Sequence, residues 1–433
     1  MIASISGIRG VLNSDLSLED VTRFAVNFGR ETGSREFLLA RDPRSTGPAI
    51  SRAVAGAVAS LGATVYDYGI ISTPALFRES RLRQLPAVMV TASHNEPQYN
   101  GLKFVEGGAG IGKGTLEAVL DGKEPGRGEY RRGVSKPGRH PSYVEDLVKE
   151  FGEGSCGGMK VAVDLGGGAA ISHAVPLLTR LGCEVSSMND SYGVFNRTVD
   201  PVADDLVLLR KVVRQKECDI GLGFDCDGDR LVIVDAGGRK RTGDYMLTLA
   251  LSAMLDQTGE KKVVVSTDTT QGVDDVAGRA GASVFRSKVG EANVVGMMNE
   301  RGARLGGEGS SGGLIDASFN YCRDSLLAAV AILRELKSKG RKFYESVPAY
   351  HQKRVALVIP RAKALRGIRR LAIEHRDADL TDGLKLALPR KAWVLIRPSG
   401  TEDAVRVSAE AGTEEAADRV ARKFGRMLQE LSR

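Results

Sequence analysis

The sequence predicts an α/β protein of three topologically similar domains with mixed, mostly parallel sheets, plus a smaller C-terminal α+β domain, around a central cleft. A short apolar run, a helical segment, a glycine and a second apolar run follow one another three times between residues 36 and 287. These runs are rich in valine and leucine without clean alternation, which is typical of strands buried on both faces of a parallel sheet. After about residue 348 the pattern changes to a shorter mixture of strands and helices.

The three copies of the repeat have closely similar elements. Their first strands are expected at 36–42, 159–164 and 262–268, and their first helices at 49–61, 172–181 and 273–280. The glycine after each helix is a usual C-terminal stop. Each copy continues through a second helix into a third apolar run, and successive βαβ units of this kind indicate α/β domains. The expected domains are 1–138, 139–238, 239–347 and 348–433.

Each third apolar run ends in a polar or glycine-rich loop. Open α/β sheets bind ligands at the carboxyl ends of their strands. Three such loops in equivalent positions therefore predict one composite site.

The composition is that of a globular protein. The 433 residues are 42% apolar and 27% charged, with 52 glycines and a net charge of +7. The longest apolar stretches are far shorter than the roughly 18 to 20 residues of a membrane span, and no signal peptide is recognisable, so a cytoplasmic protein without a membrane partner is expected. Five cysteines without a C-x-x-C pair argue against both a disulfide framework and a structural zinc site.

The segment DCDGDR places Asp225, Asp227 and Asp229 at alternate positions. This spacing lets carboxylates of one turn converge on a hard divalent cation. An EF-hand needs glycine at the sixth position and glutamate at the twelfth, but those residues are Arg230 and Ala236. Three protein oxygens suit Mg²⁺ that completes its shell with a substrate oxygen. A solvated acidic turn is the alternative.

A candidate nucleophile, Ser93, lies in TASHNEPQYNGLK, directly after a valine-rich run. His94 follows it, and Lys103 comes ten residues later. A serine in this place suits a nucleophile activated by a metal or a base. By itself, however, the pair of Ser93 and His94 is better explained by a turn serine that caps the next segment.

The loop GGEGSSGG contains a G-x-S-x-G pattern centred on Ser311, which raises an α/β-hydrolase with His351 or His375 as base. That motif requires a helix after the turn, whereas residues 314–321 begin no obvious helix. Sugar recognition suits this loop better, because Glu308 can accept from hydroxyls and glycines allow a close approach of the backbone.

The last polar loop, RPSGTED, suits a phosphate because guanidinium, hydroxyl and backbone donors bind phosphate oxygens. Its candidate residues are Arg397, Ser399, Gly400 and Thr401, with Arg406 as a second guanidinium. The basic stretches 127–140 and 361–370 suggest nucleic-acid binding, but an aromatic content of 5% disfavours a base-stacking surface. The whole excess of positive charge falls in residues 349–433, which suits an anionic sugar substrate and no nucleic-acid partner.

Taken in order, the motifs SGIRG, TASHN-x-P-x-YNG-x-K, DxDGDR, KVGE, GGE…GG and RPSGTE resemble those of the α-D-phosphohexomutases over essentially the full chain. The chain is most similar to the archaeal phosphoglucosamine mutase type, because its sugar loop reads GGE…GGLI. The resemblance implies interconversion of hexose or hexosamine 1-phosphate and 6-phosphate through a phosphoserine enzyme and a 1,6-bisphosphate intermediate. A metal-dependent sugar-phosphate phosphatase or phosphotransferase on the same scaffold is the alternative.

The resemblance also implies roles for individual residues. Ser93 would carry the phosphoryl group and bind Mg²⁺ together with the three aspartates of DCDGDR. The positions around the phosphoserine match Arg9, His94 and Lys103, with Lys103 as proton carrier for the sugar hydroxyl. Sugar-binding positions match Arg230, Glu308 and Ser310. The positions that hold the non-reacting phosphate match Arg397, Ser399, Gly400, Thr401 and Arg406, with Lys288 facing them from the third domain.

Three departures from the family pattern leave the sugar specificity open. Glu96 and Asp403 replace usual prolines, and three residues rather than two separate Glu308 from Gly312. The choice among glucosamine, glucose and mannose phosphates is therefore not predicted, and neither is the oligomeric state.

Overall fold

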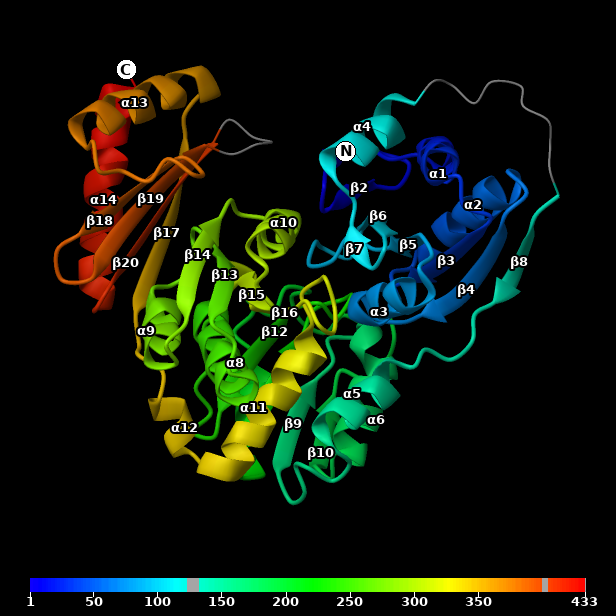
Figure 1. The fold of residues 1–433 in the computed structure, drawn as a ribbon, viewed down its shortest axis with the longest axis horizontal. Coiled ribbons are helices and arrows are strands. Elements are labelled where there is room, and N and C mark those ends of the chain that lie inside the picture. The colour runs from blue at the N-terminus through cyan, green and yellow to red at the C-terminus, as the bar shows by residue number, and fades with distance from the viewer. Residues whose placement is uncertain (123–131, 399–403, 433) are drawn as a thin grey trace.

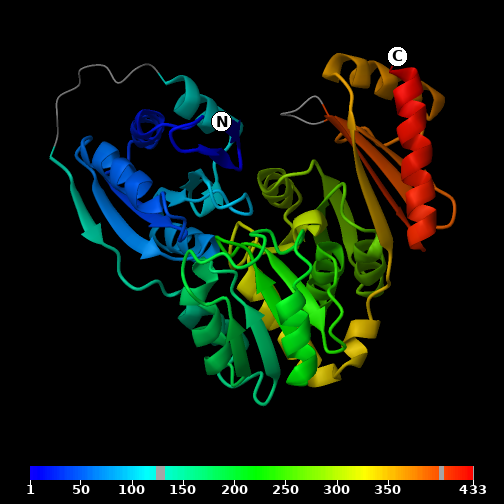
Figure 2. The same cartoon turned by 180° about the vertical axis from the view of Figure 1, so that it is seen from behind.

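The computed structural model describes residues 1–122, 132–398 and 404–432. The chain forms four domains, I to IV, each built around one β-sheet. Domains I and IV occupy the two ends of an arc, with domains II and III between them (Figure 1). The view from behind shows the same order, with the two end domains apart (Figure 2).

Domain I has an eight-stranded sheet in the order β1-β2-β6-β5-β3-β4-β8, with β7 paired to β6. Its strands are β1 (Ile2–Ser4), β2 (Gly7–Val11), β3 (Glu36–Arg41), β4 (Thr64–Ile70), β5 (Ala87–Val90), β6 (Tyr99–Glu106), β7 (Ala109–Gly110) and β8 (Val134–Pro137). Its helices are α1 (Leu18–Thr32), α2 (Gly47–Ala59), α3 (Thr73–Arg83) and α4 (Lys113–Asp121).

Domains II and III share one topology, with sheet orders β10-β9-β11-β12 and β14-β13-β15-β16. The strands of domain II are β9 (Lys160–Asp164), β10 (Glu184–Met188), β11 (Ile220–Phe224) and β12 (Leu231–Asp235), and its helices are α5 (Tyr143–Phe151), α6 (Ala174–Arg180) and α7 (Val207–Gln215), with the 3₁₀ turn η1 (Ala169–Ser172). Domain III has β13 (Lys262–Ser266), β14 (Ser283–Ser287), β15 (Leu305–Glu308) and β16 (Gly313–Asp316), with η2 (Gly309–Ser311), α8 (Gly243–Thr258), α9 (Gly272–Arg279), α10 (Glu291–Arg301) and α11 (Ser325–Lys339).

Domain IV follows the short helix α12 (Lys342–Glu345) and is α+β, as expected. Its antiparallel sheet has the order β17-β20-β19-β18. The strands are β17 (His351–Val358), β18 (Leu384–Leu388), β19 (Ala392–Pro398) and β20 (Ala404–Ala411), and the helices are α13 (Arg361–Glu374) and α14 (Glu414–Leu431). Apolar side chains of both helices pack with those of the strands in one core, so the helices cover one face of the sheet.

The predicted repeat is confirmed in all three α/β domains. In each, two strands pair in parallel with a central first strand, and the third strand then pairs with an antiparallel fourth, as in β10, β9, β11 and β12. The same pairing joins β4, β3, β5 and β6, and β14, β13, β15 and β16. Each predicted site loop therefore connects two adjacent antiparallel strands, which fixes both of its ends.

The packing agrees with the composition. One buried cluster runs through domains I, II and III and includes Leu326 to Leu333 and Leu336 of α11. All five cysteines lie in the described part of the chain and are free and buried. No described helix is both long and apolar enough to cross a bilayer.

Candidate active site

The nucleophile candidate, Ser93, lies in the serine loop (residues 91–98), which connects β5 to β6. Ser93 is fully buried and has φ of 52°, an unusual backbone conformation for a residue other than glycine. Its backbone N–H donates to Thr91 Oγ1 at 2.8 Å, and its own Oγ donates to Asp225 Oδ2 at 3.3 Å. The serine loop and the metal loop (residues 225–230) therefore meet at this hydroxyl, as the pattern of loops predicted.

A buried arginine holds the serine loop in this conformation. The side chain of Arg44 is 0% exposed and pairs through Nε with Asp42 Oδ2 at 3.0 Å. Its two terminal nitrogens donate to four backbone carbonyls of this segment, those of Ser93, Asn95, Glu96 and Tyr99. Five bonds use all five donors that a guanidinium has. Asp42 also accepts from Thr91 at 2.6 Å, which ties the start of the loop to the same network.

The metal loop brings three buried carboxylates together. One ligand oxygen each of Asp225, Asp227 and Asp229 lies within 4.8 Å of the others, and each side chain is fully buried. Burial, together with the charges of the other two aspartates, raises the pKa of Asp225 well above its ordinary value. Asp227 Oδ1 and Asp229 Oδ1 accept no hydrogen bond from the described residues. Converging, unpaired carboxylate oxygens are the donor set that a divalent cation requires, so these residues fit a hard cation.

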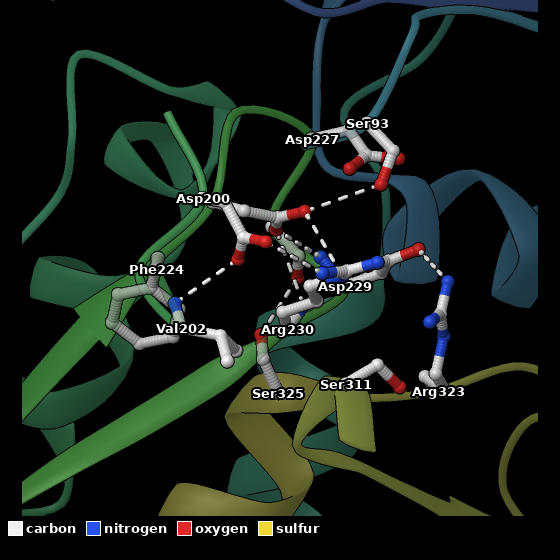
Figure 3. A network of polar contacts seen from close by, with 12 residues as sticks. Ser93, Asp200, Val202, Phe224, Asp227, Asp229, Arg230, Ser311, Arg323 and Ser325 are labelled. Atoms are coloured by element: carbon white, nitrogen blue, oxygen red, sulfur yellow. Dashed lines mark hydrogen bonds and ion pairs between the residues drawn. The ribbon is translucent and has the colours of Figure 1, made fainter. Parts of the chain in front are cut away.

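Three of the predicted cationic side chains lie around the aspartates and the serine loop. Lys103 Nζ lies 2.7 Å from Asp227 Oδ2 and 2.9 Å from Asp229 Oδ2. Burial opposes the charge on Lys103, but the two carboxylates outweigh it and raise its pKa. Arg9 Nη1 donates to Asn95 Oδ1 of the serine loop at 3.0 Å. Arg230 pairs with Asp200 Oδ2 at 3.2 Å (Figure 3). It also lies 4.0 Å from Asp225 Oδ2.

His94 is held as a neutral imidazole. Burial, with the nearby charges of Arg230, Arg9 and Arg323, lowers its pKa to about 2. Its Nδ1 has no partner among the described residues. The side chain after Ser93 therefore adds no positive charge of its own at neutral pH.

The sugar loop (residues 306–313) presents Glu308 at the end of β15. Glu308 is buried, and burial raises its pKa although Arg323 opposes the effect. Its Oε1 accepts from the backbone N–H of Gly290 at 2.7 Å, which places the loop beside the segment that contains Lys288. Lys288 itself is exposed. The loop continues into strand β16 and not into a helix, so the hydrolase motif has no structural basis here.

The two serines of the sugar loop differ in position. Ser311 is buried and its Oγ donates to the carbonyl of Glu308 at 3.4 Å. Ser310 lines a cavity of about 350 Å³ between domains II, III and IV, together with Arg241, Asp244 and Arg354.

Domain IV carries the predicted phosphate-binding residues. Arg397 on β19 and Arg406 on β20 are directly paired in the antiparallel ladder, so their side chains lie on the same face of the sheet. Arg397 lies 3.6 Å from Asp382, and Asp382 accepts from the N–H of Val289 in domain III at 3.0 Å. Ser399, Gly400 and Thr401 lie outside the described residues.

Comparison with known proteins identifies the family. The phosphoglucomutase/phosphomannomutase models match the chain in order: alpha/beta/alpha domain I at residues 2–123, domain II at 141–238, domain III at 242–353 and the C-terminal domain at 357–426. The chain belongs to the phosphoglucomutase/phosphomannomutase family.

Members of this family are phosphohexomutases, which are isomerases that act as intramolecular phosphotransferases, and this chain is an enzyme of that class. It is 32% identical to a probable phosphoglucosamine mutase of Methanopyrus kandleri, over 97% of this chain and 96% of that protein. It is 31% identical to a phosphoglucomutase/phosphomannomutase of Thermococcus kodakarensis, over 95% and 94%. These relatives confirm the family that the motifs indicated.

Solved structures confirm the four-domain fold. A phosphoglucomutase/phosphomannomutase family protein of Burkholderia thailandensis matches with a TM-score of 0.86 and 25% identity, over 99% of this chain and 98% of that one. An Aspergillus fumigatus N-acetylphosphoglucosamine mutase, solved with GlcNAc-6P and magnesium, shares the fold with a TM-score of 0.57 and 16% identity, over 91% and 82%.

Several residues of this candidate site lie outside the motifs that the sequence analysis selected. Arg44 organises the serine loop, Thr73 donates to Asp227 Oδ2 at 2.6 Å, and Arg323 pairs with Asp229 at 2.8 Å. The D-x-R spacing of Asp42 and Arg44, just after a predicted buried strand, was an available signal for the first. Thr73 and Arg323 belong to no local pattern of polar residues.

Proposed function

We propose that the chain is a Mg²⁺-dependent phosphohexomutase that interconverts the 1- and 6-phosphates of a hexose or hexosamine through phosphoserine at Ser93 and a hexose 1,6-bisphosphate. The observation that carries this proposal is the buried hydrogen bond from Ser93 Oγ to Asp225, one of the three converging aspartates of the metal loop. The names of the archaeal relatives favour glucosamine phosphate as the preferred substrate. They support the mutase and give no support to a phosphatase on the same scaffold.

The cation belongs between the serine and metal loops. Asp225, Asp227 and Asp229 would hold it together with the group on Ser93. When bound, Mg²⁺ supplies positive charge that neutralises the oxygens of the transferring phosphoryl group. The unpaired oxygens of Asp227 and Asp229 support this assignment.

The protein's own side chains position the reaction. Phosphoryl transfer depends more on positioning and electrostatic stabilisation than on covalent chemistry by the protein. Arg9 contacts Asn95, two residues after Ser93, and His94 follows the serine directly as a neutral imidazole. Lys103 is the proposed proton carrier for the sugar hydroxyl, because a cation that takes up the charge of Asp227 and Asp229 would remove the interaction that raises its pKa. Arg44 keeps the serine fixed, because four of its bonds restrain the backbone of this segment and the fifth anchors it to Asp42.

The sugar and its second phosphate bind on the side of domains III and IV. Glu308 accepts hydroxyl hydrogens of the sugar, and Arg230 and Ser310 are the further proposed sugar ligands. Arg397 and Arg406, from neighbouring strands, grip the phosphate that does not react, together with Lys288 and with Ser399, Gly400 and Thr401. Two guanidinium groups on one sheet face suit a dianion.

The test follows phosphate from the serine to the sugar. We expect mass spectrometry of the purified protein to find phosphate on the peptide that contains Ser93, and coupled assays to detect Mg²⁺-dependent isomerisation of glucosamine, glucose or mannose phosphate. Ser93→Ala is expected to abolish both. Ser80→Ala is a matched control, because Ser80 is a buried serine of domain I that bonds Leu85 O. Full mutase turnover by Ser93→Ala, or release of free phosphate faster than isomerisation, would refute the proposal.

A further inference from the structure

Arg323, immediately before helix α11, is a buried arginine that contacts carboxylates from three different segments. Its Nη2 lies 2.8 Å from Asp229 Oδ2 of the metal loop (Figure 3). Its Nη1 lies 3.6 Å from Glu308 Oε2 of the sugar loop. Its Nε lies 3.1 Å from Glu291 Oε2, at the start of α10. One guanidinium thus touches both a candidate cation ligand and the candidate sugar ligand.

The backbone around Arg323 is rigidly held. Asp324 caps α11 by accepting from Leu327 N at 3.0 Å, and it also accepts from the hydroxyl of Tyr143 at 2.5 Å. Ser325 Oγ donates to the carbonyl of Gly228 in the metal loop at 2.6 Å. The backbone of Arg323 is therefore held in place, so a change in the contacts of the guanidinium is not offset by movement of the backbone.

The partners of Arg323 are fixed to each other as well. Glu308 accepts from Gly290 N, and Glu291 accepts from the backbone N–H of Arg323 at 2.9 Å. All three carboxylates contact the one guanidinium of Arg323, whose side chain is 8% exposed. A change in the charge of one carboxylate therefore changes how strongly the arginine holds the others.

We propose that Arg323 is a positioning residue that couples binding of the divalent cation at the metal loop to binding of the hexose phosphate at the sugar loop. The inference rests on the proposed function of the site. A cation that shares the charge of Asp229 weakens the attraction between Asp229 and Arg323. The guanidinium is then held more firmly by Glu308 and Glu291, which orders Glu308 for the sugar. Coupling between two sites is reciprocal, so the sugar phosphate also tightens cation binding.

The experiment measures Mn²⁺ affinity of the full chain by electron paramagnetic resonance, without and with saturating sugar phosphate at isomer equilibrium. Glucosamine, glucose and mannose 6-phosphates are used in parallel, so the choice of hexose does not decide the outcome. For the wild-type protein we expect at least one sugar phosphate to tighten Mn²⁺ binding about fivefold or more. In Arg323→Gln the ratio of the two affinities is expected to fall below about twofold.

Two further variants separate coupling from folding. Arg323→Lys keeps the charge, but its single ammonium cannot span three carboxylates, so its ratio of Mn²⁺ affinities with and without sugar phosphate should also fall. This variant provides the test if Arg323→Gln does not fold. Arg304→Gln breaks the two hydrogen bonds between Arg304 and Asp316, which lie at the end of β15 and β16 opposite to Glu308. This variant should keep the wild-type ratio of Mn²⁺ affinities. A merely structural role would lower the melting temperature and both affinities without changing their ratio.

The outcomes separate a failure of the coupling from a failure of the proposed mutase function. A wild-type ratio near one, or a wild-type ratio retained in the folded Arg323 variants, would overturn the coupling alone and leave the mutase intact. Failure of the wild-type protein to bind any of the three sugar phosphates would overturn the proposed function and the coupling together.

Discussion

Replacement of Arg44 by lysine should disable Ser93 while leaving sugar binding largely intact. A lysine ammonium donates from one point, whereas Arg44 donates from three nitrogens to Asp42 and four carbonyls. At least two buried carbonyls would lose their partner, and each such loss costs roughly 1 to 3 kcal/mol. The φ of 52° at Ser93 is itself unfavourable by about 1 to 3 kcal/mol. Without the bonds of Arg44, the serine loop should therefore move to a more favourable backbone conformation.

A shift of Ser93 by about 1 Å is enough to lower a rate about 100-fold. We therefore expect Arg44→Lys to reduce kcat about 100-fold, while KM for the sugar phosphate changes by less than about threefold because domains III and IV are untouched. The free energy of unfolding should fall by about 2 to 6 kcal/mol.

The assay combines steady-state kinetics, urea unfolding and hydrogen exchange of the serine-loop amides. Arg304→Lys is the matched control, since it makes the same replacement in a pair distant from Ser93. It should change stability without a comparable loss of kcat. An Arg44→Lys enzyme with wild-type kcat and unchanged amide exchange in residues 91–98 would refute the reasoning.

Two further perturbations test other parts of the site. Asp227→Ala removes one of three converging carboxylates, so Mg²⁺ should raise the melting temperature of the wild-type protein but not of this variant. The activity of the variant should fall at least about 100-fold. An equal rise in melting temperature with Mg²⁺ in both proteins would count against the metal site. Burial raises the pKa of Asp244 to about 6 despite the charge of Arg354. As pH rises, the Asp244 carboxyl therefore loses its proton in the unfolded chain before it does so in the folded protein. The free energy of unfolding should fall by up to about 3 kcal/mol between about pH 4 and pH 6. Urea unfolding across that range should show this fall reduced in Asp244→Asn, and identical pH profiles for the two proteins would contradict it.

The sequence was sufficient for the parts of this protein that depend on short-range patterns. Unalternated apolar runs, each followed by a helical segment and a glycine, predicted the repeated α/β topology, because a parallel sheet buries both faces of its strands. The alternate spacing in DCDGDR placed three carboxylates on one turn, and the structure gathers them within 4.8 Å. The repeated position of the polar loops predicted one composite site, and in the structure two of these loops meet at the hydrogen bond between Ser93 and Asp225.

Only the tertiary structure decided which side chains hold the loops. Arg44 bonds a carbonyl 49 residues away, Arg323 an aspartate 94 residues away, and Thr73 another aspartate 154 residues away. Such contacts leave no periodicity in the chain, because the partners meet only after separate strands and helices have packed. The sequence by itself thus determined the chemical groups of the site and the topology that carries them. Packing between domains determined their charge, their orientation and their links to one another, because these depend on burial and on distances that no local pattern encodes.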